Sequence, residues 1–203
     1  TVLPARQQPP HLPRSRRYRQ FHCFHQSVPT TVFYDIGGLL GEMALDRMLS
    51  DSLPPSAFQM QYRFSTGEAV DAVVRLREKV LPIDSKFPLE DYRRLEENGE
   101  EGRKNFFSAV RKHADSIAKK YILPGEGTLD MALMFVPSEG VYYELLHSKD
   151  GNGMALDEYC RTRHVVPVSP STLFAHLQVI LLGLRGMQVE ENARGLLSSL
   201  SGL

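Results

Sequence analysis

Three charged residues stand at a spacing that could bind a metal ion and act on a phosphate ester. Asp84 and Lys86 lie two residues apart in the stretch "LPIDSKFPLEDY", residues 81–92, and Asp71 lies in the preceding apolar run "VDAVVRL". Alternate side chains of a strand share a face, so Asp84 and Lys86 should project together, with Ser85 turned to the other side. Taken alone, the same pattern also describes an exposed ion pair at a strand end, which contributes little energy.

A hairpin between the two apolar runs would bring Asp71 close to Asp84. Two carboxylates repel each other at short range unless a cation lies between them, and a divalent ion such as Mg²⁺, or Mn²⁺ in its place, binds oxygen ligands of this kind. Glu42, on the helix expected before the strands, could add a third carboxylate. The Lys86 ammonium could orient or deprotonate an attacking water, and it could neutralise charge that grows on a phosphoryl group.

The elements that would carry these residues are predicted in the order α-β-β-β-α-α-β-α-α-β-α. Helical spacing relates four apolar residues near the start of the domain: Leu40, Met43, Ala44 and Met48. Alternation over residues 70–74 indicates a strand with two faces, one carrying Val70, Ala72 and Val74 and the other Asp71 and Val73. In chain order, the pattern predicts a helix over 37–53, strands within 58–64, 65–76 and 77–87, helices over 88–98 and 103–121, a strand over 129–137, helices over 138–146 and 155–163, a strand over 164–170 and a helix over 171–188.

Length and composition predict one folded domain with an appended tail. Residues 1–35 are rich in Pro and Arg without apolar periodicity, which is typical of a disordered tail, whereas 36–203 should form the domain. Residues 1–34 hold five of the 24 Lys and Arg residues and no acid, so 19 basic residues remain against 24 acidic residues in the rest of the chain. The domain should therefore be mildly acidic, and any contact with nucleic acid must come from a local basic patch.

Cysteine usage and hydropathy favour a cytoplasmic protein. Cys23 and Cys160 do not make a disulfide framework, and "HCFH", residues 22–25, has no second pair of ligands at the spacing of a zinc finger. The most apolar run, residues 179–184, is too short to span a bilayer. An isolated His113 is expected to be exposed, because it has no partner at the spacing of metal ligands.

Several of these segments, taken in order, resemble the bacterial DNA recombination protein RmuC family. The resemblance covers roughly residues 36–200. The segments that carry it are "GGLLGE" (37–42), "VDAVVRL" (70–76), "LPIDSKFPLEDY" (81–92), "MFVPSEGVYYELL" (134–146), "VSPSTLFAHL" (168–177) and "QVEENA" (188–193).

This resemblance implies an α/β fold with a restriction-endonuclease-like mixed sheet flanked by helices. Its PD-(D/E)XK core, of order α-β-β-β-α-β, would be followed by extra β-α elements. Asp71 would take the place of the first acid of the motif, with Val70 replacing the usual proline, while Asp84 would be the second acid. Lys86 would be the lysine of the motif, and Glu42 would match its helix glutamate.

The implied function is a metal-dependent deoxyribonuclease that cuts DNA intermediates and limits rearrangements. Its partner would be DNA and its cofactor Mg²⁺ or Mn²⁺, without a small-molecule cofactor, and its oligomeric state stays open. Family members usually carry a membrane anchor and a long coiled coil before the core. Because neither is expected in this chain, it is interpreted as a truncated or misread product. The alternative function is a non-catalytic DNA-binding or assembly scaffold that keeps the nuclease fold.

Overall fold

The structure is a computed structural model that describes residues 37–150 and 153–201. The tail predicted over 1–35, with Cys23 and the "HCFH" stretch, lies outside the described residues. The elements are α1 (Gly37–Ser52), η3 (Pro55–Ala57), β1 (Phe58–Arg63), β2 (Ala69–Leu76), β3 (Lys79–Asp84), α2 (Leu89–Tyr121), η4 (Pro124–Glu126), β4 (Ala132–Phe135), α3 (Glu139–His147), α4 (Leu156–Thr162), β5 (Val165–Val168) and α5 (Pro170–Ser201).

The sequence prediction of the element order is confirmed. The two helices expected over 88–98 and 103–121 form α2 as one element with a kink, because Gly99 inside it has a φ of 53° and a ψ of −123°. A positive φ costs glycine little, since it has no Cβ. Ser138 caps α3 as a preferred N-terminal residue, and its hydroxyl accepts a hydrogen bond from the Val141 N–H.

The strands form one mixed five-stranded sheet in the order β1-β2-β3-β4-β5. The β1-β2 and β2-β3 pairs are antiparallel, whereas β3-β4 and β4-β5 are parallel. The parallel pairs fit the long helical connections between their strands, since a parallel neighbour needs a crossover and an antiparallel one needs only a turn. The fold is therefore a mixed α/β domain, as the sequence predicted.

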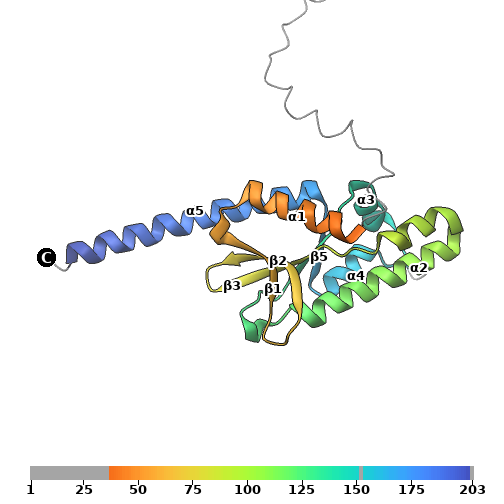
Figure 1. The fold of residues 1–203 in the computed structure, drawn as a ribbon, viewed down its shortest axis with the longest axis horizontal. Helices are drawn as coiled ribbons and strands as arrows, with labels where there is room; N and C mark the ends of the chain where they lie inside the picture. The colour runs from red at the N-terminus through yellow and green to blue at the C-terminus, as the bar shows by residue number, and fades with distance from the viewer. Residues whose placement is uncertain (1–36, 151–152, 202–203) are drawn as a thin grey trace, which may run out of the picture.

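Helices cover both faces of the sheet (Figure 1). On one face, α1 and α5 bury Leu45, Leu49, Leu173 and Leu177 against the strands. On the other face, α2, α3 and α4 pack a larger apolar cluster around Phe106. This three-layer arrangement holds β2 and β3 rigidly in the middle of the domain.

The buried face of α1 differs from the predicted one. Leu45 and Leu49 are fully buried, while Met43 is 59% exposed, so the core-facing stripe is rotated from the expected positions. Several apolar side chains on adjacent turns made the register ambiguous from sequence, and the contact with α5 selects it. Glu42 consequently lies at the border of this face and is partly buried.

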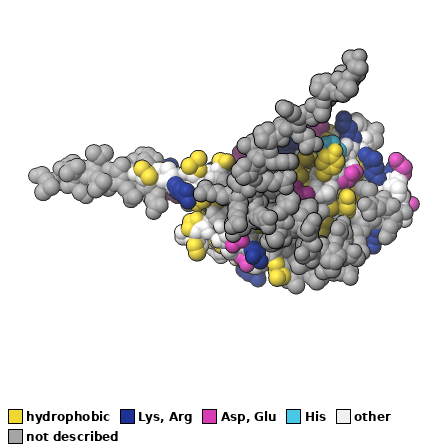
Figure 2. Space-filling model, turned by 90° about the horizontal axis from the view of Figure 1, so that it is seen from above, with side chains coloured by type: hydrophobic (Ala, Val, Ile, Leu, Met, Phe, Trp, Pro, Cys, Tyr) yellow, Lys and Arg dark blue, Asp and Glu magenta, His cyan; other side chains and the backbone are white. Residues whose placement is uncertain are grey.

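The end of α5 extends past the sheet (Figure 1), and hydrophobic side chains are visible on the surface where this helix leaves the body of the domain (Figure 2). Val179, Leu182 and Val189 are exposed on α5. Among the described residues, no helix is both long enough and apolar enough to cross a membrane.

Candidate active site

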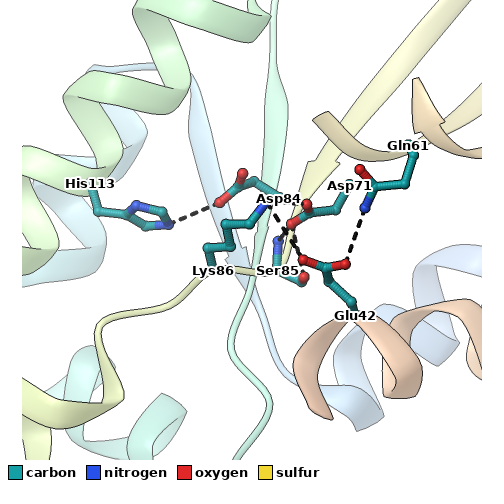
Figure 3. A network of polar contacts seen from close by, with 7 residues as sticks. All are labelled: Glu42, Gln61, Asp71, Asp84, Ser85, Lys86 and His113. Atoms are coloured by element: carbon teal, nitrogen blue, oxygen red, sulfur yellow. Dashed lines mark hydrogen bonds and ion pairs between the residues drawn. The ribbon is translucent and has the colours of Figure 1, made fainter. Parts of the chain in front are cut away.

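The four residues singled out from the sequence lie in one cluster, which neighbouring elements contribute (Figure 3). Glu42 comes from α1, Asp71 from the middle of β2, and Asp84 is the last residue of β3. Lys86 follows two residues later, in the connection to α2. Its ammonium nitrogen lies 2.6 Å from Asp71 Oδ1 and 3.6 Å from Glu42 Oε1.

Asp71 is fully buried and its carboxylate is held by three donors. The backbone N–H of Ser85 donates to Oδ2 at 2.8 Å, and the Ser85 hydroxyl donates to the same oxygen at 2.9 Å. Lys86 donates to Oδ1 at 2.6 Å. A buried carboxylate stays charged only when such donors replace the water it has lost, so the connection after β3 is built around Asp71.

The prediction that Ser85 turns away from the cluster is wrong. Strict alternation of side chains applies within a strand, but β3 ends at Asp84 and the backbone turns there. The Phe87 N–H donates to the Ser85 carbonyl, which marks this turn. Ser85 and Lys86 therefore both reach Asp71.

The regular pattern of β2 is also interrupted at Asp71. The registered pairs between β1 and β2 skip the position where Gln61 faces Asp71, and Gln61 has a φ of 50°. Val70 and Val73 pack in the apolar cluster between the sheet and α2, whereas Ala72 and Val74 pack in the cluster on the opposite face, beneath α1 and α5. The expectation that Val70 shares a face with Ala72 and Val74 is therefore wrong.

Gln61 contributes a second polar contact to the cluster. Its side-chain amide donates to Glu42 Oε2 at 3.1 Å. A left-handed backbone at a residue other than glycine is uncommon and costs energy, and such residues concentrate at functional sites. The side chain of Gln61 thus anchors one oxygen of Glu42, while the other oxygen faces Lys86.

Close packing of α1 against the end of β3 fixes the position of Glu42. A Cβ added at Gly41 would lie 2.9 Å from the Ser85 carbonyl oxygen, closer than such atoms pack. Only glycine permits this approach of helix to backbone at the residue beside Glu42.

The charge of Lys86 is favoured by its surroundings. Partial burial by itself would lower the pKa of Lys86, but the hydrogen bond and charge of Asp71 and the charges of Glu42 and Asp84 outweigh it, so the pKa is raised above its usual value. The side chain is nevertheless 53% exposed. The cluster therefore presents an ammonium whose charge its neighbours favour, with access to solvent, beside three carboxylates.

Asp84 is buried but incompletely satisfied. The residue is only 3% exposed, and its Oδ2 makes no hydrogen bond with any described residue. The nearest charged or titratable partner of this oxygen is His113 Nε2 on α2, 3.1 Å away. That nitrogen likewise makes no hydrogen bond within the described chain, so the two atoms meet as an ion-pair contact alone.

His113 is the site residue that sequence reasoning missed. It was expected to be exposed, yet its side chain is only 19% exposed and faces Asp84 (Figure 3). Its neighbours Val110, Ala114 and Ile117 are buried, so the helical period of α2 would have placed His113 at the border of the core-facing stripe. That signal was present in the sequence, but the partner strand could not be identified from it.

The donor set suits a hard divalent ion, although it is not assembled around one. Among the described residues, no group of three or more His, Cys, Asp or Glu side chains is already close enough to hold a metal ion. The Lys86 ammonium supplies the positive charge next to Asp71 and Glu42 instead. The unsatisfied Asp84 Oδ2 is a carboxylate oxygen free of hydrogen bonds, which is the kind of ligand that Mg²⁺ and Mn²⁺ take.

A separate groove of about 520 Å³ runs along α2 and has a mixed charge. Arg103, Lys104 and Lys112 line it, but Arg111 forms an ion pair with Asp150. From the sequence, any contact with nucleic acid is expected to come from a local basic patch. The phosphate contact stays a prediction.

Comparisons with known proteins match the sequence of the chain to one family. The model of the RmuC family matches residues 35–203 of the chain. Two curated proteins named DNA recombination protein RmuC homolog, from the Temecula1 and 9a5c strains of Xylella fastidiosa, are each 33% identical over 173 residues. The match covers 77% of this chain and 37% of each relative. No solved structure matches the chain.

Proposed function

The chain belongs to the RmuC family, and we propose that its described domain is a divalent-metal-dependent deoxyribonuclease acting on DNA intermediates. Hydrolysis of phosphodiesters in such intermediates would limit DNA rearrangements. The relatives are named as DNA recombination proteins, and this chain spans 37% of their length. The proposed substrate and activity accordingly refer to this domain alone.

The observation that carries the proposal is the gathering of one ammonium and three carboxylates from α1, β2 and the end of β3. Lys86 touches Asp71 and approaches Glu42, and the charge of Asp84 also acts on it. The order of the first elements, α1-β1-β2-β3-α2-β4, is the one expected of a restriction-endonuclease-like core. An exposed ion pair, the simpler alternative, would not include a fully buried carboxylate.

The roles follow from burial and charge. Asp71, Asp84 and Glu42 would hold the Mg²⁺ or Mn²⁺ ion. When bound, such an ion supplies positive charge that polarises a phosphoryl oxygen and makes water more acidic. Lys86 keeps its proton at neutral pH because its pKa is raised. It would therefore act as a positive charge that orients water and stabilises growing negative charge, and not as the base that the sequence also allowed.

Ser85 and Gln61 would position these groups. Ser85 holds Asp71 through two hydrogen bonds to one oxygen, which leaves Oδ1 directed at Lys86. Gln61 holds Glu42 from the opposite side. Fixed charges of this kind are worth more in catalysis than mobile ones, because they need no reorganisation during the reaction.

One observation favours the alternative, a non-catalytic DNA-associated scaffold. Asp71 already accepts three hydrogen bonds and is fully buried, which is also how a purely structural carboxylate is held. In that case the cluster would fasten β2 to the β3–α2 connection, and DNA would be bound without being cut.

Cleavage of labelled single- and double-stranded DNA distinguishes the two functions. The wild-type chain should cut DNA with Mg²⁺ or Mn²⁺ and not with EDTA, and Asp84→Asn and Lys86→Met should each reduce the rate on the order of 10²-fold or more. Asp115→Asn is the matched control, because Asp115 is an acid of α2 that is paired with Arg163 on the surface. Cleavage that survives both site substitutions would refute the assignment. DNA binding by a folded wild-type chain without cleavage would support the scaffold.

A further inference from the structure

We propose that His113 is a ligand of the metal ion held by Asp84, which would make this a mixed nitrogen–oxygen site selective for Mn²⁺ over Mg²⁺. The inference rests on the metal dependence of the proposed function but not on nuclease activity. It joins a histidine from α2 to Asp84 of β3, and water would complete the ligand set, since no group of three or more such side chains among the described residues is close enough to hold an ion.

The first support is a pair of buried atoms that lack hydrogen bonds. Asp84 Oδ2 and His113 Nε2 face each other (Figure 3), and both are buried and unsatisfied within the described chain. The two atoms form an ion pair only when the imidazole is protonated. Without a hydrogen bond, each keeps part of the cost of burial, which is about 1–3 kcal/mol for a polar atom left wholly unpaired. A ligand that both atoms can bind at once would remove this cost at both.

The second support is the distance between these atoms. Two donors bound at right angles to one ion, each at about 2.1 Å, lie about 3.0 Å apart. The observed separation of Asp84 Oδ2 and His113 Nε2 is 3.1 Å. The pair therefore already has the spacing of adjacent ligands in an octahedral site, without movement of either side chain.

The third support is that both donors are held in place. Asp84 ends a central strand and is 3% exposed. His113 lies on α2 between residues packed into the core, including the fully buried Val110 and Ala114. The site is also open on one side, since the neighbouring Lys86 is half-exposed and can leave room for an ion and its water ligands.

The ligand types set the selectivity. Imidazole nitrogen is a common ligand for transition metals, whereas Mg²⁺ prefers oxygen and retains much of its water. Mn²⁺ accepts carboxylate oxygen and, as a first-row transition ion, also accepts imidazole. A His113–Asp84 pair should consequently raise the affinity for Mn²⁺ more than that for Mg²⁺.

Pulsed electron paramagnetic resonance of Mn²⁺ bound to the full chain tests the inference directly. Wild-type protein with a substoichiometric amount of Mn²⁺ should show coupling to a histidine nitrogen, and the signal should change when histidine is labelled with ¹⁵N. His113→Gln should abolish the coupling and weaken Mn²⁺ binding on the order of 10–100-fold, a loss typical of disturbed metal sites. Its Mg²⁺ affinity should change much less.

Two controls keep the result interpretable. His176→Gln removes an exposed histidine of α5 and should leave the coupling unchanged. Circular dichroism and thermal unfolding of His113→Gln should match the wild type, and His113→Asn provides a second variant if they do not.

The outcomes separate this inference from the nuclease proposal. The inference is overturned, and the nuclease assignment left standing, if Mn²⁺ binds without histidine coupling and with equal affinity to the wild type and to His113→Gln. A water molecule that bridges Asp84 and His113 would give this result. Coupling in a chain that does not cut DNA supports the inference and counts against the nuclease. A folded wild type that binds no Mn²⁺ overturns the inference and the metal dependence together.

Discussion

The contact between Asp71 and Lys86 should be energetically coupled, and a double-mutant cycle can measure that coupling. Lys86→Met replaces the ammonium with an apolar chain of similar length, and Asp71→Asn removes the charge while leaving a carbonyl oxygen for the two Ser85 donors. Each single substitution leaves an unbalanced partner, since Lys86→Met strips Asp71 Oδ1 of its 2.6 Å donor. The double substitution removes the imbalance.

The size of the coupling follows from burial. A hydrogen bond to a charged group contributes about 1.5–3 kcal/mol. Asp71 is fully buried, which favours the upper part of this range, but Lys86 is half-exposed and its charge is partly screened by water. We therefore expect a coupling free energy of about 1.5 kcal/mol, with the two single substitutions together costing more than the double one.

Urea unfolding of the four proteins at pH 7, followed by circular dichroism, supplies the free energies of unfolding. The pair Arg47 and Asp51 on α1 is the matched control, since these residues are 3.7 Å apart and about three-quarters exposed. The same cycle at this pair should give no more than about 0.5 kcal/mol. A site coupling no larger than that of the control would refute the reasoning, because the buried ion pair would then be absent in solution.

Two further predictions concern the surroundings of the cluster. Gly41→Ala should lower the free energy of unfolding in urea by about 1–3 kcal/mol, because the added Cβ would lie 2.9 Å from a backbone oxygen. The control is Gly183→Ala on α5, where nothing lies within 4 Å, and it should be neutral or stabilising. Equal effects of the two substitutions would contradict the close approach at Gly41. Burial, aided by the charge of Asp84, raises the pKa of Tyr121 to about 12. The unfolded chain should lose this phenolic proton first, at pH near 10, so stability should fall as the pH rises from about 10 to 12. Tyr121→Phe should fall less steeply, and identical pH profiles would contradict the shift.

Much of the fold was predictable because its elements have strong local patterns. The central strands are short apolar runs bounded by turns, and α2 begins after Pro88 with acidic residues in its first turn. The mixed sheet follows from tight turns between the first strands and helical crossovers later. The residues Glu42, Asp71, Asp84 and Lys86 could be grouped from the sequence because they lie on successive elements and their side chains carry complementary charges.

The parts that were missed depend on contacts between distant segments. The turned position of Ser85 depends on where β3 ends, which periodicity does not fix to a single residue. The rotated face of α1 is selected by its packing against α5. His113 reaches Asp84 only because α2 crosses back over the sheet, and no local spacing links the two residues.

Anomalous scattering from crystals of the full chain grown with Mn²⁺ tests most directly whether this cluster binds a metal. A difference map at the manganese absorption edge should show a peak about 2 Å from the Asp84 carboxylate. His113 Nε2 should lie at a similar distance from the same peak. A manganese peak at another place in the domain, or a map without a peak beside Asp84, would contradict the proposed metal site.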